Sequence, residues 1–336
     1  MPLLTPMNSS DNSNSPIRAG IVGTGFAAER RAEALQADTR SQLVAVSGHT
    51  LEKTQEFARN YDAEVIDSWT DLVLHPEVDL VVICTINLDH GMIVRAALNA
   101  GKHVVVEYPL SLDPKEAESL IALAEAKGKL LHVEHIELLG GLHQALRQWL
   151  PEIGHPFYAR YVTTKPDRPA PKRWTYHPEL YGFPLTAALS RIQRLTDLFG
   201  KVSSVSCESR FWYAGEYFTA CMCNAQLRFA NGLIGEVTYG KGETFWHTIR
   251  AFEVHGEKGT LLFDGDRGML IQGEERKLIE VAGRRGLFAK DTAMVLDYLL
   301  DGKPLYVSPA ASCYAIKVAD AARQSTELGE VINLDV

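Results

Sequence analysis

A glycine-rich turn near the N-terminus has the residue types and the spacing that bind a dinucleotide. The segment GTGFAA (23–28) follows a short apolar run and precedes a helical stretch. The first glycine permits a tight turn, the second lets the backbone approach a pyrophosphate, and the small residue at 28 lets strand and helix pack closely. The helix N-terminus then faces the anion. The strand–turn–helix context favours this over an ordinary glycine turn. The residues expected to contact the cofactor here are Gly23, Thr24, Gly25, Phe26 and Ala27.

The end of the next expected strand bears on which nicotinamide cofactor is bound. An acidic residue about 20 positions after the glycine loop would bind the ribose 2′-hydroxyl of NAD. This stretch instead reads SGHT (47–50), with no acid before Glu52. Small donors there can hydrogen-bond a 2′-phosphate, and no carboxylate repels it. We therefore expect NADPH, with NADH as the weaker alternative, bound through Ser47, His49 and Thr50; the other interpretation is a loop that accepts either cofactor.

Two arginines are candidates for binding an anionic substrate. Arg191 and Arg194 lie three residues apart in SRIQRL (190–195), so a helix would present both on one face. Arginine pairs bidentately with carboxylates, and it can stabilise charge that develops during a reaction. The alternative is that one or both pair with Asp197 or Glu179 as part of the scaffold.

Composition excludes several classes of protein. The 336 residues suggest roughly two domains at about 150 residues each, and 46% apolar residues suffice for sizeable cores. A net charge of −8 argues against a general nucleic-acid binder. No run approaches the roughly 18 uncharged residues of a membrane helix. The first sixteen residues do not have the features of a secretory signal, so we expect a disordered tail and a cytoplasmic location.

The five cysteines and the histidines of LHVEHIE (131–137) do not indicate a metal centre. The cysteine count is odd and no CxxC pair occurs, which argues against a disulfide framework or a zinc site. On a strand, His132 and His135 would point to opposite faces, so a shared ion is not expected. His135 lies near the end of its strand, where open α/β sheets bind ligands. It is either a substrate-binding residue or a satisfied core histidine.

The elements that must position these residues change character near residue 137. Residues 17–136 alternate strands with helices, which predicts βαβ units, a parallel sheet and a Rossmann domain. The expected strands are 17–22, 42–48, 64–66, 78–86, 102–109 and 129–136, and the expected helices are 26–36, 51–60, 69–74, 90–100 and 113–127. In the last helix, Asp113, Pro114 and Glu116 form a predicted capping box.

Residues 137–336 have the pattern of an α+β domain with a large, mostly antiparallel sheet. Alternation of apolar and polar residues indicates a meander with one wetted face. The expected strands are 154–164, 202–213, 221–230, 233–242, 248–256 and 259–266, followed by helices near 287–300 and 309–326. We therefore predict a second, substrate-binding domain over 137–336.

The segments GIVGTGFAA (20–28) and VDLVVICTINLDHGMIVRAALNAGKHVVVEYPL (78–110), with the later meander, resemble the glucose–fructose oxidoreductase/inositol dehydrogenase family. The resemblance covers residues 17–336. It implies that the strand ending at Glu107 and Tyr108 lies under the cofactor. It also implies that the nicotinamide side of the pocket is lined by Thr85, Ile86, Asn87 and His90.

The departures from that family concern the groups that move a proton. Its dehydrogenases carry Glu-Lys-Pro where this chain has Glu107-Tyr108-Pro109, and their later Asp…His pair falls near Thr186 and Ser190. Oxidation of an alcohol needs a general base for the hydroxyl proton. A sugar or polyol dehydrogenase is therefore the weaker alternative.

Glu-Tyr-Pro is instead the variant of one branch of the family, the biliverdin reductases. The stretches LLHVEHIELLGG (130–141), RWTYHPELYGFPL (173–185) and AALSRIQRLTDLFG (187–200) resemble its cyanobacterial members. The resemblance implies NADPH-dependent reduction of the linear tetrapyrrole biliverdin IXα to bilirubin IXα. A hydride goes to the central methine carbon, C10, and a proton to a pyrrole nitrogen.

In that chemistry Arg191 is expected to be the key catalytic group. Arg191, Arg194 and His135 are expected to bind substrate. Tyr108 is the rival acid, since a phenol can donate a proton. A non-enzymatic NADP-binding regulator remains a further alternative, and the protein is expected to be a monomer or a homodimer.

Overall fold

The computed structural model describes residues 15–335, which form two compact units. The first unit comprises residues up to Ile136 together with Gly286–Cys313, and the second comprises Glu137–Arg285 and the residues from Tyr314 onward. The expected disordered tail at 1–16 lies almost wholly outside the described residues.

The first unit contains a six-stranded parallel sheet in the order β3-β2-β1-β4-β5-β6, as expected for a Rossmann domain. Its strands read as short apolar runs because they are covered on both faces; all four residues of β4 are buried. The strands are β1 (Ile17–Val22), β2 (Ser41–Ser47), β3 (Glu64–Val65), β4 (Leu80–Ile83), β5 (His103–Val106) and β6 (Leu131–Val133).

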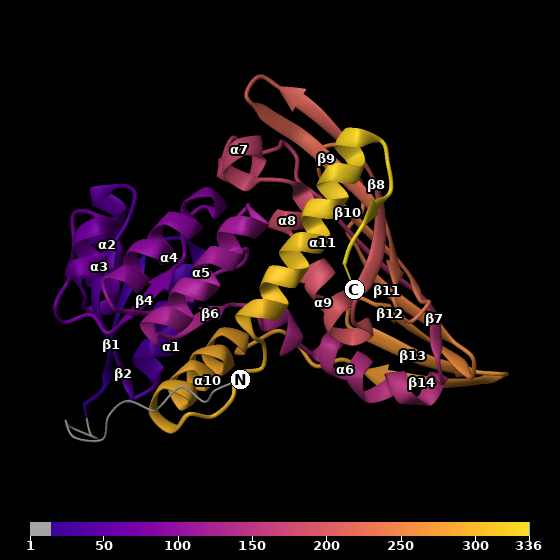
Figure 1. Ribbon diagram of the computed structural model, residues 1–336, viewed down its shortest axis with the longest axis horizontal. Helices are drawn as coiled ribbons and strands as arrows, with labels where there is room; N and C mark the ends of the chain where they lie inside the picture. The colour runs from indigo at the N-terminus through magenta and orange to yellow at the C-terminus, as the bar shows by residue number, and fades with distance from the viewer. Residues whose placement is uncertain (1–14, 336) are drawn as a thin grey trace. The chain divides into compact units, whose positions relative to one another are not determined.

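Helices connect these strands in the predicted order (Figure 1). They are α1 (Phe26–Ala37), α2 (Leu51–Tyr61), α3 (Trp69–Leu74), η1 (Asn87–Asp89), α4 (His90–Asn99) and α5 (Pro114–Lys127). Asp113 caps α5 through the Lys115 amide at 2.8 Å. The reciprocal half of the predicted capping box is wrong, because the Glu116 carboxylate accepts from the Ser111 hydroxyl at 2.5 Å.

Helix α10 (Leu287–Asp301) belongs to the first unit, whereas the sequence pattern assigned it to the second domain. Its residues Val295, Leu296 and Leu299 join the same core cluster as Leu35 of α1. Phe288 also meets Phe26 edge to face, with ring centroids 6.3 Å apart. The sequence shows that α10 has an apolar face. It does not show what that face packs against, because the partner lies more than 200 residues away in the chain.

The second unit contains a nine-stranded sheet in the order β14-β13-β12-β11-β7-β10-β9-β8-β15. Its strands are β7 (Pro156–Pro166), β8 (Val202–Ala214), β9 (Tyr217–Phe229), β10 (Ile234–Gly242), β11 (Ile249–Gly256), β12 (Gly259–Asp264), β13 (Arg267–Gln272), β14 (Glu275–Glu280) and β15 (Ile332–Asn333). The sheet is mostly antiparallel, as predicted, but β10 pairs in parallel with β7. Strands β13, β14 and β15 were not predicted. In β14 only one of the six residues is buried, so the apolar alternation is lost.

The remaining helices of the second unit are short, apart from the last. They are η2 (Ile136–Leu138), α6 (Gly141–Trp149), η3 (Leu150–Ile153), η4 (Trp174–Tyr176), α7 (Pro178–Tyr181), α8 (Pro184–Ala187), α9 (Ser190–Phe199) and α11 (Pro309–Leu328). The part of α11 from Tyr314 onward lies along the sheet (Figure 1), where the Ser325 hydroxyl accepts from the Cys207 amide of β8 at 2.9 Å.

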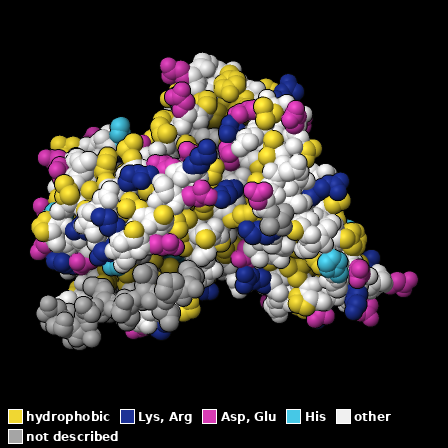
Figure 2. All heavy atoms as spheres, viewed as in Figure 1, with side chains coloured by type: hydrophobic (Ala, Val, Ile, Leu, Met, Phe, Trp, Pro, Cys, Tyr) yellow, Lys and Arg dark blue, Asp and Glu magenta, His cyan; other side chains and the backbone are white. Residues whose placement is uncertain are grey.

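The surface carries charges of both signs. On the face shown in Figure 2, basic and acidic side chains are interspersed. Of the helices within residues 15–335, none has both the length and the apolar character needed to cross a membrane.

Candidate active site

The glycine loop of the first unit has the conformation that a dinucleotide site requires. Gly23 has φ of +117°, and a Cβ there would lie 2.3 Å from the Cys84 carbonyl oxygen, so only glycine fits. A Cβ on Gly25 would meet no atom within 4 Å, which leaves the backbone at the start of α1 open to a ligand. Ala28 is fully buried against the strand. These residues fit a pyrophosphate bound at the N-terminus of α1.

The other predicted loop residues differ in exposure. Thr24 and Ala27 are half-buried, whereas Phe26 is 71% exposed, with the Arg30 guanidinium carbon 5.6 Å from its ring centroid. At the end of β2, Ser47 is buried, and its carbonyl accepts from the Gly23 amide at 2.8 Å.

Beyond β2, His49 and Thr50 are exposed. They are therefore accessible to a 2′-phosphate, while Ser47 lies beneath the loop. Their role as cofactor ligands stays a prediction.

Replacing Ser47 by aspartate should shift cofactor preference toward NADH. A carboxylate at the end of β2 would bring a negative charge near the 2′-phosphate and should weaken NADPH binding by roughly tenfold, about 1.4 kcal/mol. Titration of each cofactor should therefore show the Kd for NADPH rising relative to that for NADH. Ser47→Ala, which removes the hydroxyl without adding charge, is the control. An unchanged ratio in Ser47→Asp would overturn the assignment of this strand end.

The residues predicted to line the nicotinamide side cluster where β4 and β5 end. Thr85 and Ile86 are half-buried and Asn87 is buried. His90 is buried with Nδ1 2.7 Å from the Pro109 carbonyl oxygen, and its Nε2 lies 3.4 Å from that of Thr85. Burial lowers the pKa of His90. A neutral imidazole has a single N–H, so the ring can donate to only one of these two carbonyl oxygens. Ligands bind at this edge in open α/β sheets.

A buried polar network, missed by the sequence analysis, lies behind Glu107 in the first unit. Asp291 of α10 is its centre, because its carboxylate bonds the Arg31 guanidinium, lies 2.8 Å from His132 Nε2 and accepts from the Tyr306 hydroxyl at 2.7 Å. Arg31 Nε also donates to Glu107 at 3.1 Å. Burial alone would raise the pKa of Asp291, but Arg31 and His132 hold it well below its usual range. The sequence does not single out Asp291, because α10 also carries Lys290, Asp297 and Asp301.

Tyr108 rests on His135. The two rings are stacked, with centroids 5.4 Å apart and planes 4° apart. His135 is fully buried; its Nε2 lies 2.8 Å from the Ser312 hydroxyl, and its backbone amide donates to the Tyr306 hydroxyl at 3.0 Å. This burial favours the core-histidine interpretation over direct substrate binding. His132 and His135 have different partners, and the described residues contain no group of three or more side chains suited to a metal ion.

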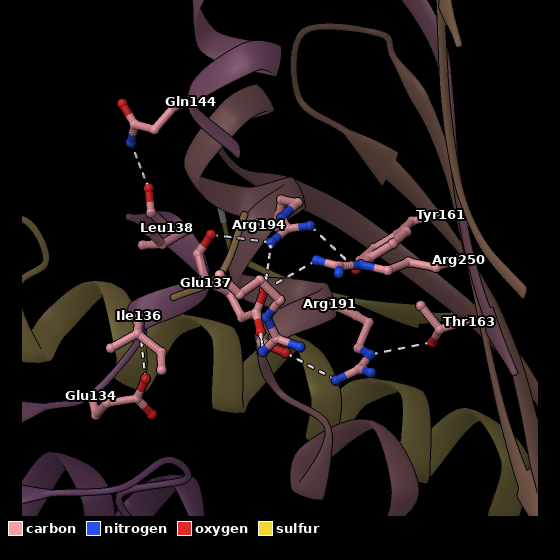
Figure 3. Close-up of polar contacts among 12 residues, drawn as sticks. Glu134, Ile136, Glu137, Leu138, Gln144, Tyr161, Thr163, Arg191, Arg194 and Arg250 are labelled. Carbon is pink, nitrogen blue, oxygen red and sulfur yellow. Dashed lines mark hydrogen bonds and ion pairs between the residues drawn. The ribbon is translucent and has the colours of Figure 1, made fainter. Parts of the chain in front are cut away.

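Arg191 is half-buried at the start of α9 in the second unit. Its Nε donates to the Thr163 hydroxyl at 3.3 Å and its Nη1 to the Ser190 hydroxyl at 3.0 Å. Its guanidinium carbon lies 5.1 Å from the centroid of the Tyr239 ring. In Figure 3 the side chain points toward Thr163. Hydroxyls and an aromatic ring thus hold this cation.

Arg194 has a different environment from Arg191. It is 1% exposed; its Nη2 donates to the Glu137 carboxylate at 3.2 Å, and its Nη1 donates to the Tyr161 hydroxyl at 3.2 Å (Figure 3). Its ionic partner is therefore Glu137, not Asp197 or Glu179 as the alternative interpretation had it. Buried and held in this way, Arg194 orients the Glu137 carboxylate, and its role in binding substrate stays a prediction.

Glu137 also pairs with two arginines from distant parts of the chain, which sequence spacing could not reveal. Arg250 lies 3.5 Å from its carboxylate, and Arg284 also bonds it. Burial would raise the pKa of Glu137, but Arg194, Arg284 and Arg250 hold it below its usual value. These residues, with Asp266, border a hollow of about 230 Å³ that is open to solvent. The lining has three guanidinium groups and two carboxylates, so its net charge is positive.

The Rossmann fold of the first unit, with its glycine loop, and the large sheet of the second unit, with its arginines, are found together in one class of oxidoreductase. Residues 17–135 match the model of an oxidoreductase family with an NAD-binding Rossmann fold, and residues 151–334 match the C-terminal alpha/beta domain of the same family. The chain belongs to this family, the Gfo/Idh/MocA oxidoreductases, which confirms the resemblance drawn from the sequence.

Similar proteins narrow the class. A crystal structure of biliverdin reductase in complex with biliverdin and NADP+ from Synechocystis sp. PCC 6803 is 56% identical, with a TM-score of 0.92, over 93% of this chain and 100% of that one. Biliverdin reductase A of Mus musculus is 34% identical over 55% of this chain and 59% of its own length. That of Homo sapiens is 35% identical over 46% and 50%. The chain thus spans about half the length of these curated relatives.

More distant structures share the fold alone. A levoglucosan dehydrogenase in complex with NADH and levoglucosan has a TM-score of 0.84 at 19% identity, over 95% of this chain and 99% of that one.

Proposed function

We propose that this protein reduces biliverdin IXα to bilirubin IXα with NADPH. The observation that carries the proposal is the 56% identity, over the full length of the neighbour, to a biliverdin reductase bound to biliverdin and NADP+. The Glu107-Tyr108-Pro109 variant and Arg191 support it from within the chain.

The first unit would hold the cofactor. The backbone of Gly23 and Gly25 and the start of α1 would bind the pyrophosphate, and His49 and Thr50 would meet the 2′-phosphate. NADPH, when bound, supplies the hydride that biliverdin accepts at C10. Thr85, Ile86, Asn87 and Tyr108 would orient the nicotinamide. The buried His90 ring lies beside them, near the Pro109 and Thr85 carbonyl oxygens.

Arg191 would act on the bilin. Its guanidinium, positioned by Thr163, Ser190 and the Tyr239 ring, can donate hydrogen bonds to the lactam edge or a propionate and stabilise charge as the bilin is reduced. A guanidinium has a pKa above 12, so direct proton donation is unfavourable. We propose that Arg191 polarises the bilin, and that the proton reaches the pyrrole nitrogen through water or a propionate.

The positions of the parent family's acid–base pair argue against alcohol oxidation. Thr186 is 3% exposed and Ser190 is 5% exposed, and neither side chain can serve as a general base at neutral pH. Tyr108 stands where the family has lysine. A sugar or polyol substrate would therefore find no group to accept its hydroxyl proton at these positions.

A three-way assay tests the proposal. The protein is mixed with NADPH and biliverdin, with NADP+ and a polyol, and with NADPH alone, and the cofactor's near-ultraviolet absorbance is followed. Oxidation of NADPH that depends on biliverdin, with bilirubin as product, is the expected result. Reduction of NADP+ by the polyol would favour the parent activity, and cofactor binding without turnover would favour a regulator. A cytoplasmic location and a monomeric or homodimeric state stay predictions.

A further inference from the structure

A buried lysine of the second unit is held by aromatic rings in place of a carboxylate. Lys241, near the end of β10, is 5% exposed. Its Nζ lies 3.6 Å from the ring centroid of Tyr181, 4.4 Å from that of Tyr176 and 5.1 Å from that of Phe218. It also donates to the Thr175 carbonyl. Within residues 15–335, no carboxylate lies within ion-pair distance of this ammonium.

A buried charge of this kind is not explained by packing. Burying an ammonium without a counter-ion is costly, and replacing a buried charge by an apolar group of similar volume is often neutral or stabilising. Cation–π contacts recover only part of the cost, about 2 kcal/mol each when desolvated.

The contacts of Lys241 lead to Arg191. The Tyr181 ring, over which the ammonium lies, places its hydroxyl 2.9 Å from that of Tyr239. Tyr239 is two residues before Lys241 on β10, so the two side chains point to the same face of the sheet. The Tyr239 ring in turn supports the Arg191 guanidinium at 5.1 Å. Both tyrosines are buried, at 7% and 8% exposed, which leaves them little freedom to move independently.

We propose that Lys241 is a positioning residue for Arg191 and acts through the Tyr181–Tyr239 pair. The ammonium fixes the Tyr181 ring, the hydroxyl contact fixes Tyr239, and Tyr239 fixes the guanidinium. The inference rests on the proposed function, because it assumes that Arg191 acts on the bilin. It adds a residue that does not itself touch the substrate.

The charge on Lys241 should make this positioning depend on pH. Burial lowers the pKa of Lys241 to about 7. Cys221, paired with Lys241 on β9, and Asp167 raise it, whereas Arg173 and Lys165 lower it further. Tyr176, which bonds Asp167 at 2.6 Å, and Tyr181 both have pKa values raised by burial, so they stay neutral. The ammonium is therefore present below about pH 7 and lost above it.

The main test is Lys241→Met. For the wild type, kcat for biliverdin reduction should fall as pH rises through about 7. The variant should have a kcat lowered by about 10- to 100-fold at pH 6, the range expected for a misplaced catalytic group. Its kcat should no longer fall as pH rises through about 7. The Kd for NADPH should be unchanged. Lys201→Met is the matched control, because Lys201 is exposed and lies 4.0 Å from the Tyr314 ring centroid, outside these contacts.

A second variant and a second readout keep the test decisive. Tyr181→Phe retains the ring but removes the hydroxyl contact, so it should lower kcat and abolish the fall in kcat with rising pH even if Lys241→Met does not fold. The NMR signal of Arg191 Nε–H, assigned by its loss in Arg191→Lys, should titrate near pH 7 in the wild type and not in Tyr181→Phe.

The NMR readout does not require turnover, so it separates this inference from the proposed function. If the Arg191 Nε–H signal changes with pH near 7 in a protein that does not reduce biliverdin, the link between Lys241 and Arg191 is supported and the proposed biliverdin reductase activity is rejected. Wild-type kcat and pH profile in Lys241→Met or Tyr181→Phe would overturn the inference.

Discussion

Replacing Arg191 by alanine should lower kcat for biliverdin reduction by about 10²- to 10³-fold, the usual cost of removing one preorganised donor at a developing charge. The Kd for NADPH should stay unchanged, because every residue assigned to the cofactor belongs to the first unit. Stopped-flow measurement of NADPH oxidation and a separate binding titration would give both values.

Two further variants separate the possible roles of the site. Arg191→Lys keeps the charge but loses the planar fork of donors, so its kcat should fall between that of the wild type and that of the alanine variant. Tyr108→Phe removes the rival acid while keeping the ring on His135, and we expect less than about a tenfold loss, below the 10²–10⁴ typical of an essential acid. An alanine variant as active as the wild type would remove Arg191 from the mechanism.

Replacing Asp291 by alanine should lower the free energy of unfolding by about 3–5 kcal/mol, the range for removing one partner of a buried ion pair. The loss is large because Arg31, His132 and Tyr306 all bond this carboxylate away from solvent. Urea denaturation measures the change. The control is Asp297→Ala on the same helix, since Asp297 pairs with Arg40 where both side chains are about one-third exposed, and it should cost much less.

Asp291 also predicts how stability depends on pH. The pKa of Asp291 is lower in the folded protein than the ordinary value near 3.9 of the unfolded chain. Its contribution is therefore present in full above about pH 4 and is lost as pH falls below that value. In Asp291→Asn the free energy of unfolding should fall less steeply with decreasing pH below about 4 than it does in the wild type. Denaturation curves collected from pH 7 downward measure this. An unchanged pH dependence, or an unfolding free energy within 1 kcal/mol of wild type in the alanine variant, would contradict the role assigned to the network.

Local patterns predicted most of the fold. The strand–turn–helix around Gly23 and the order of the parallel strands follow from apolar runs and capping residues next to one another in the chain. Pairings between distant segments leave no such signal. The parallel contact of β7 with β10 and the return of α10 to the first unit depend on tertiary packing.

In the candidate site too, the sequence predicted features of neighbouring residues but not contacts between distant segments. The spacing of Arg191 and Arg194 placed both on α9, but it could not show that Arg194 is buried on Glu137 while Arg191 is held by Thr163 and Tyr239. Arg250 and Arg284 reach Glu137 across 113 and 147 residues of sequence. The burial of Lys241 could not be predicted from the strand pattern, because it depends on the rings of Tyr176, Tyr181 and Phe218.

The central claim is that a hydride passes from NADPH directly to C10 of the bilin. The most direct test is a single turnover with NADPH carrying deuterium at C4 of the nicotinamide, prepared as each of the two stereoisomers, with the product examined by mass spectrometry and NMR. One stereoisomer should give bilirubin with deuterium at C10, and the other should give unlabelled bilirubin. Bilirubin without deuterium from both stereoisomers, or with deuterium at another carbon, would contradict the account.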